Sequence, residues 1–127
     1  VFEYFIHKYV LHNIKLFPKY FKQHFGTHHK NARKNNMLDY NYSNILKESS
    51  RFELLGLTFL LIIHLPFLIV LPYFYGTLVA SSFIYYVCHR KSHLDVAWGK
   101  KHIPWHYNQN KNWGVRSNMI DKLFKTS

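Results

Sequence analysis

Cysteine is nearly absent from this chain of 127 residues, in which Cys88 is the single thiol. One cysteine excludes an internal disulfide framework and a cysteine-rich zinc knuckle. The P-loop, GxGxxG, HExxH and GxSxG patterns are also missing. The sequence therefore gives no support to nucleotide binding or to the common hydrolase chemistries.

Acidic residues are scarce: 6 Asp+Glu stand against 17 Lys+Arg, for a net charge of +11. The chain is nevertheless 48% hydrophobic and 19% aromatic, which excludes a disordered basic tail. The basic residues form no single stripe, and nucleic-acid binding would leave ten histidines unexplained, so we expect no nucleic-acid partner. The length corresponds to one domain over residues 1–127.

Charge is missing altogether from Leu54 to His89, a run of 36 residues without Asp, Glu, Lys or Arg. This run amounts to about 54 Å of helix, against a hydrocarbon core of about 30 Å. Helix-breaking residues lie near its middle, at Pro66, Pro72 and Gly76. We expect a membrane hairpin with arms of roughly Leu54–Leu71 and Tyr73–Cys88. The alternative is a buried helix pair in a soluble domain.

Both flanks of this run are basic, at +5 before it and +6 after it. Because Lys and Arg gather on the cytoplasmic side of membranes, the hairpin would enter and return to that side. The basic residues would hold the loops at an anionic leaflet, or would dock an acidic electron donor. A further helix is expected before Pro18, and since the chain begins at Val1 inside a patterned segment, we expect it to lack its natural N-terminus.

Histidine is unusually frequent in this chain. Nine of the ten histidines form four groups, which lie beyond the uncharged run or at its end. Residues four apart share one face of a helix, so two imidazoles with that spacing can converge on one metal ion. A pair five apart would hold an ion from two sides or reach two ions, and a histidine beside another suits a second ion or a bridge. The groups are His7 and His12; His24, His28 and His29; His89 and His93; and His102 and His106.

Nine histidines exceed the four ligands of a structural zinc site and predict two metal ions. Neutral imidazole suits iron, zinc, copper or nickel. His64 stands alone in the apolar run, where a packing role is the better interpretation, so we leave it out of the site. The ions need compensating charge from neighbouring carboxylates, for which Glu3 and Asp95 are the best candidates and Asp121 a weaker one. Each could equally be an ordinary solvated carboxylate or a helix cap.

The ordered boxes EYFIHKYVLH, HFGTHHK and HRKSHLDVAWGKKHIPWHY, followed by KNWGVRSNMIDKLF, resemble the fatty acid hydroxylase/sterol desaturase superfamily over nearly all of the chain. The resemblance is to a bacterial subgroup of these integral membrane, histidine-box, non-haem di-iron oxygenases. It implies an all-α fold, in which a membrane hairpin carries a histidine-rich helical cap on the cytosolic side. It also implies metal ligation by His7, His12, His24, His28, His29, His89, His93, His106 and His102.

The activity that the resemblance implies is O₂-dependent hydroxylation or desaturation of a fatty acyl chain, a sterol or a carotenoid. Two iron ions, for which zinc could substitute, would be the cofactor, and a ferredoxin or cytochrome b5 type protein would supply electrons. The sequence departs from the family in its last box, where Trp105-His106-Tyr107 carries one histidine in place of an adjacent pair, and in Lys125-Thr126, which replaces a closing Gly-Thr. The first membrane segment of the family is also missing before Val1. A non-catalytic, degenerate metal-binding relative is therefore the alternative.

Overall fold

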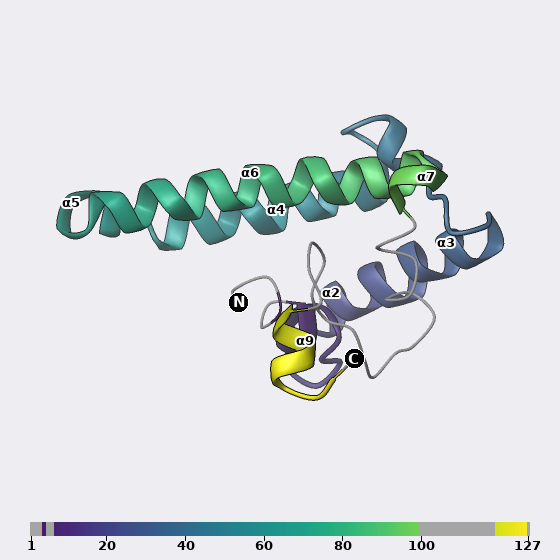
Figure 1. Ribbon diagram of the computed structural model, residues 1–127, viewed down its shortest axis with the longest axis horizontal. Coiled ribbons are helices and arrows are strands. Elements are labelled where there is room, and N and C mark those ends of the chain that lie inside the picture. The colour runs from purple at the N-terminus through teal and green to yellow at the C-terminus, as the bar shows by residue number, and fades with distance from the viewer. Residues whose placement is uncertain (1–3, 5–6, 100–118, 127) are drawn as a thin grey trace.

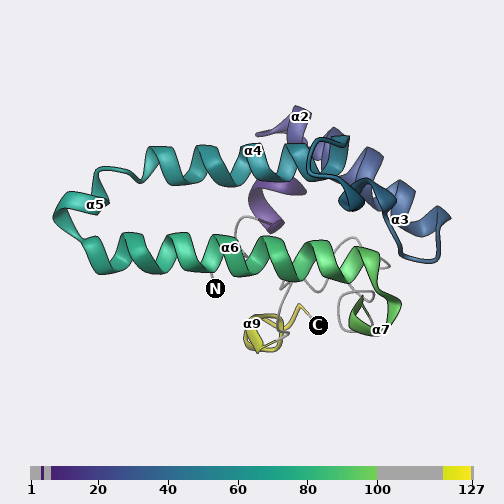
Figure 2. The same ribbon diagram turned by 90° about the horizontal axis from the view of Figure 1, so that it is seen from above.

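The computed structural model describes Tyr4, residues 7–99 and residues 119–126. Within these residues every regular element is a helix, which confirms the all-α prediction. Two long helices lie side by side in one layer, and a group of shorter helices lies against one end of that layer (Figure 1). Figure 2 shows the two long helices from above, joined at the far end by a short helix.

The long layer is a hairpin of α4 (Glu48–Ile63) and α6 (Pro72–Leu94), connected through α5 (Phe67–Val70). A buried hydrogen bond of 2.7 Å joins the Ser50 and Tyr86 hydroxyls near the polar end. The Tyr75 hydroxyl donates to the Leu61 carbonyl, at 3.3 Å, near the connection. The hairpin predicted from the uncharged run is therefore present as two antiparallel helices.

The break in the hairpin differs from the predicted one. The first arm ends at Ile63 rather than Leu71, because Pro66 follows so closely and its ring blocks a continuing helix. Leu71 is held out of the helical conformation before Pro72, which then begins α6. Gly76, expected to contribute to the break, lies inside α6.

The side chains of the hairpin remain largely exposed at its closed end. Large apolar side chains point outward there, with 88% of Ile69 and 91% of Tyr73 exposed. No helix in the described part of the chain combines the length and the apolar character needed to cross a membrane. The hairpin thus presents an apolar surface without a single helix that qualifies as a span.

A second layer crosses the polar end of the hairpin. It runs through α2 (Pro18–Phe21), η2 (Lys22–His29) and α3 (Lys30–Lys34) as one nearly continuous helical stretch. Pro18 begins this stretch, because its fixed φ and missing N–H suit the first turn of a helix. Figure 1 shows the stretch beneath the right-hand ends of α4 and α6. Smaller elements complete the cap: η1 (His7–Leu11), η3 (Tyr40–Ser43), α7 (Val96–Gly99) and α9 (Met119–Leu123).

Two contacts fix the small elements to the rest. The Arg90 side chain, on α6, donates to the carbonyls of Tyr42 and Ser43, at 2.7 Å and 3.2 Å, and holds η3 against the hairpin. The Tyr4 ring stacks on Phe124 at the end of α9, with 5.4 Å between centroids. The buried interior that results is mostly polar, since five histidines belong to it: His7, His28, His29, His89 and His93.

Candidate metal centre

Seven histidines of the described residues gather into two adjoining clusters where the two layers meet. In each cluster the nitrogen atoms that could bind a metal lie within 4.8 Å of one another. We call them the four-histidine cluster, formed by His7, His12, His24 and His29, and the three-histidine cluster, formed by His28, His89 and His93. Rings from the two clusters are neighbours, with 5.4 Å between the centroids of His24 and His28.

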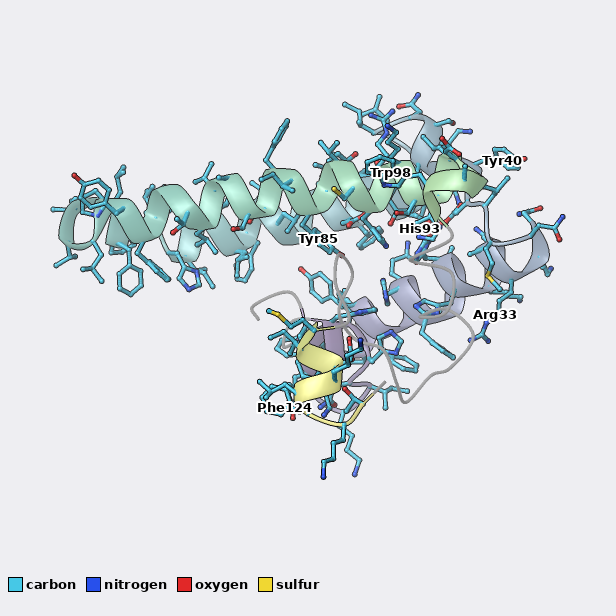
Figure 3. The ribbon with its side chains drawn as sticks, in the orientation of Figure 1. Arg33, Tyr40, Tyr85, His93, Trp98 and Phe124 are labelled. Carbon is cyan, nitrogen blue, oxygen red and sulfur yellow. The ribbon has the colours of Figure 1, made fainter. Side chains whose placement is uncertain are left out.

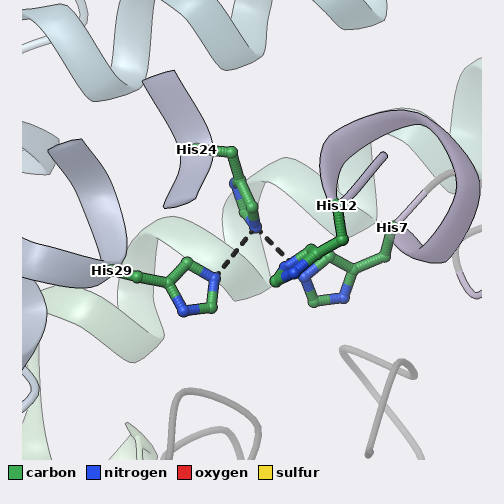
Figure 4. Close-up of side chains that lie close together, drawn as sticks. All are labelled: His7, His12, His24 and His29. Carbon is green, nitrogen blue, oxygen red and sulfur yellow. Dashed lines mark hydrogen bonds between the residues drawn. The ribbon is translucent and has the colours of Figure 1, made fainter. Parts of the chain in front are cut away.

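The four-histidine cluster is built from two π-helical segments. His24 is central, and its Nε2 lies 3.1 Å from the Nε2 of His7 and 3.1 Å from the Nε2 of His29 (Figure 4). The His12 ring packs edge-on against both His7 and His24, at centroid distances of 4.8 Å and 5.1 Å. The cluster therefore draws on two segments that are apart in the sequence. The segment η1 and the residue after it supply His7 and His12, and η2 supplies His24 and His29.

The π-helical register explains which histidines meet. A π-helix closes i→i+5 hydrogen bonds, as the His12 amide does with the His7 carbonyl at 3.1 Å, so residues five apart share a face. His7 and His12 therefore face one cluster, and so do His24 and His29. The α-helical expectation that His24 would share an ion with His28 differs from the structure, in which His28 belongs to the other cluster.

The three-histidine cluster combines η2 with the polar end of α6. His89 and His93 are one α-helical turn apart, and their Nε2 atoms lie 3.3 Å from each other, as the i, i+4 spacing predicts. His28 comes from the facing layer and meets His93 edge-on, at a centroid distance of 4.3 Å. Figure 3 shows His93 on the side of α6 that faces α3.

The spacing of these nitrogens fits metal coordination. Two nitrogens bound at about 2.1 Å to one ion are separated by about 3.0 Å at a right angle and by about 3.4 Å at a tetrahedral angle. The Nε2 separations of 3.1 Å and 3.3 Å fall in this interval. The donor set is entirely imidazole, which suits iron and zinc.

Hydrogen bonds at the opposite ring nitrogen orient all three imidazoles of the three-histidine cluster. His28 Nδ1 lies 2.8 Å from Asp39 Oδ2, His89 Nδ1 lies 2.7 Å from Glu53 Oε1, and His93 Nδ1 lies 3.3 Å from the Met37 carbonyl. Carbonyls and ionised carboxylates only accept hydrogen bonds, so each Nδ1 carries the proton. Nε2 is then the nitrogen of each ring that can bind a metal ion.

Burial disfavours the protonated form of five imidazoles in the two clusters. Loss of water and the neighbouring His7 lower the pKa of His12 to about 3. Burial, followed by adjacent imidazoles, also lowers the pKa of the other cluster members for which a shift is resolved, well below the ordinary value: His24, His28, His29 and His93. A neutral imidazole binds a cation, and a protonated one does not.

Asp39 and Glu53 are the carboxylates that sequence reasoning missed. They lie 11 and 36 residues from the histidines they contact, so no local spacing reveals them. One signal was present for Glu53: it comes just before the uncharged run and His89 ends it, so a hairpin places the two side by side. Asp95, the expected carboxylate, is exposed and accepts hydrogen bonds from the Ala97 and Trp98 amides, which makes it the cap of α7.

The remaining expected residues have different outcomes. His102, His106 and Glu3 lie outside the described residues. Asp121 is fully buried, and its carboxylate accepts from the Thr126 hydroxyl at 2.9 Å. His64 lies at the closed end of the hairpin, outside both histidine clusters, and its Nδ1 is 2.9 Å from the Leu60 carbonyl.

An apolar cavity of about 480 Å³ extends from the clusters along the hairpin. Its polar end is formed by His7, His24 and His28, and its far end includes Ile63 and Phe74. Along α4 alone, the distance from Glu53 to Ile63, ten residues further on, corresponds to about 15 Å of wall. A cavity of this size is in the range of small-molecule binding sites.

Comparisons with known proteins give no relative. No protein-family model matches the chain, and neither a curated protein nor a solved structure matches it significantly. The two histidine clusters and the cavity are therefore the basis for assigning a function.

Proposed function

We propose that this protein is a membrane-bound non-haem di-iron oxygenase of the fatty acid hydroxylase/sterol desaturase type, which hydroxylates or desaturates a C–H bond of a lipid. The observation that carries the proposal is the continuity between the cavity and the clusters. One elongated apolar cavity has imidazoles of both clusters at one end and only hairpin residues at the other. A hydrocarbon chain bound there would reach the metal centre with one of its carbons.

The residues of the cavity would bind and orient the chain. Leu57, Leu60 and Leu78 line it with aliphatic side chains, and Phe59 and Phe74 add aromatic ones. Such walls bind hydrocarbon through the hydrophobic effect and exclude water from the reacting carbon. Fatty acyl, sterol and carotenoid substrates all have the required apolar surface.

The metal ions would be held by the two clusters. Each cluster offers at least three imidazoles, enough to bind an ion and leave coordination positions for other ligands. Two iron ions bound in this way supply oxygen activation, the chemistry required to attack an unactivated C–H bond. Zinc would fill the same ligand set without redox activity.

The surface of the hairpin supports membrane insertion. Exposed large apolar side chains cover its closed end, and the described residues carry no charge between Glu53 and Arg90. Contiguous exposed apolar surface of this kind marks a membrane or protein contact. The cavity would then open to the bilayer interior, where the lipid is dissolved, while the basic cap faces the cytoplasm and an electron donor of the ferredoxin or cytochrome b5 type.

A non-catalytic metal-binding protein is the second candidate. It is favoured by the three-histidine cluster, which has one imidazole fewer than its neighbour within the described residues, and by the single histidine of the last box, His106. Such a protein would bind metal ions and leave lipids unchanged.

Turnover by the reconstituted chain distinguishes the two. The iron-loaded protein is placed in phosphatidylcholine vesicles containing palmitate, cholesterol or β-carotene, with reduced ferredoxin and ¹⁸O₂. The proposal predicts lipid that has gained one labelled oxygen atom or lost two hydrogens, as detected by mass spectrometry. The His24→Ala variant, which lacks the central imidazole of the four-histidine cluster, is the control and should give neither product. Unchanged lipid in all three vesicle types would contradict the proposal.

A further inference from the structure

The three-histidine cluster has a complete set of groups that fix its imidazoles before any ion arrives. A ring is fixed in two ways: a hydrogen bond at Nδ1 sets its rotation, and a stacked neighbour sets its plane. The Nδ1 of His28 is hydrogen-bonded to Asp39, and the Nδ1 of His89 is hydrogen-bonded to Glu53. In addition, the Tyr85 ring stacks on His89, with 5.4 Å between centroids and 14° between planes.

Asp39 is itself held on both carboxylate oxygens. Its Oδ2 accepts a hydrogen bond from the Ser49 hydroxyl at 3.0 Å, and its Oδ1 accepts one from the backbone N–H of Asn41 at 3.0 Å. Its own amide donates to the His93 carbonyl at 3.1 Å. Asp39 therefore contacts one histidine of the cluster through its side chain and a second through its backbone.

Glu53 joins the two arms of the hairpin through one carboxylate oxygen. It is on α4, and its Oε1 reaches across to His89 on α6. Burial, together with the neighbouring Glu53 carboxylate, raises the pKa of Tyr42 well above its usual range. The Tyr42 side chain beside the Glu53 carboxylate is therefore a neutral phenol. The side chains of Asp39 and Glu53 are 2% and 11% exposed, so both negative charges lie in a poorly hydrated region next to the imidazoles.

We infer that Asp39 and Glu53 are positioning residues of the three-histidine cluster, which fix the Nδ1–H tautomers of His28 and His89 and supply two negative charges that favour a divalent cation there. The inference rests on the proposed function only in taking the cluster as a metal site. Partners of this kind raise the basicity of the ligand and typically account for about 10- to 100-fold in metal affinity.

Binding of Co²⁺ to the full chain in detergent tests the inference without any turnover. Two backgrounds separate the clusters, and each leaves only two imidazoles in the disrupted one: the double variant His24→Ala/His29→Ala keeps the three-histidine cluster intact, and His93→Ala keeps the four-histidine cluster intact. In the first background, Glu53→Ala and Asp39→Ala should each weaken Co²⁺ binding by about 100-fold and change the visible absorption of the bound ion. Glu53→Gln and Asp39→Asn retain an acceptor but lose the charge, and should weaken binding by about 10-fold.

In the His93→Ala background the same substitutions should weaken binding clearly less, because the histidines that Asp39 and Glu53 contact, His28 and His89, belong to the three-histidine cluster. Glu48→Ala is the matched control, because it removes an exposed carboxylate from the same helix, and it should have no effect in either background. Equal weakening in both backgrounds would show a general structural effect and overturn the inference, as would no weakening in the first. A chain that binds Co²⁺ as expected and does not oxidise lipid contradicts the proposed function alone.

Discussion

His28 and His29 are adjacent in the sequence and belong to different histidine clusters, with 5.6 Å between their ring centroids. Consecutive residues of a helical segment point in directions that differ by roughly 100°. This pair therefore lies at the junction of the two candidate metal sites, and the segment that carries it, η2, contributes to both. A shared segment of this kind holds the two sites at a fixed separation, as a dinuclear centre requires.

Blocking the cavity should abolish lipid oxidation and leave the metal centre intact. Gly56 lines the cavity, and a Cβ added there would meet only the Tyr20 ring, at 3.7 Å. The larger side chain of Gly56→Phe would occupy the space that we assign to the hydrocarbon chain. We expect turnover to fall roughly 10-fold or more with iron content unchanged, since a small displacement of bound substrate costs about that much or more. Turnover is measured by mass spectrometry of the lipid, and iron by elemental analysis.

Gly76→Phe is the matched control for that experiment. Gly76 is an exposed glycine of α6, outside the cavity lining, and an added Cβ there has no neighbour within 4 Å. It should retain turnover. Equal loss in the two variants, or full activity of Gly56→Phe, would contradict the assignment of the cavity.

The metal-free chain should lose stability in acid. The pKa of His12 is about 3 in the folded chain, against an ordinary 6.5, so between these pH values the unfolded chain binds more protons. This stabilising contribution is fully present above pH 6.5 and is lost as the pH falls towards 3. Each such histidine adds a slope of up to about 1.4 kcal/mol per pH unit to the free energy of unfolding.

Urea unfolding of the metal-free protein at a series of pH values, followed by circular dichroism, measures this slope. The His12→Asn variant cannot take up this proton. Its free energy of unfolding should therefore depend less steeply on pH, by up to about 1.4 kcal/mol per pH unit, which corresponds to one proton. A free energy of unfolding that stays level or rises on acidification would show that these imidazoles are not buried in the folded chain.

The closed end of the hairpin should insert into membranes. Ile69 is 88% exposed on α5, and replacing it by Asp at a lipid-facing position costs about 2.5 kcal/mol or more at the bilayer centre. Flotation of the Ile69→Asp variant with phosphatidylcholine vesicles should therefore fall by roughly 10-fold or more. Leu46→Asp, at a position 72% exposed just before α4, is the control and should float as the parent does. Identical behaviour of the two variants would contradict insertion of this end.

Much of the architecture could be predicted from the sequence, because it follows from strong local signals. The uncharged run and its prolines predict a helical hairpin, and the i, i+4 spacing predicts the meeting of His89 and His93. The end of the first arm at Ile63 could not be predicted, because two prolines near the middle offered more than one place for a break.

The details of the centre depend on features that short-range patterns do not encode. The grouping of His24 with His29 requires a π-helical register, which is rare and which the α-helical spacing rule does not anticipate. The contacts of Asp39 and Glu53 with the histidines depend on the loop before α4 and on the alignment of the two arms. Asp95 caps α7, which is the alternative that the sequence left open, because an acidic residue two positions after a histidine is also an ordinary helix cap.

The most direct test is the iron content of the purified, detergent-solubilised chain after anaerobic reconstitution with ferrous iron and removal of unbound metal. Because the structure brings seven histidines into two buried clusters, we predict two iron ions per chain. The double variant His24→Ala/His29→Ala and the variant His93→Ala, each with two imidazoles left in one cluster, should bind one. A parent chain that binds a single ion or none would contradict the di-iron account.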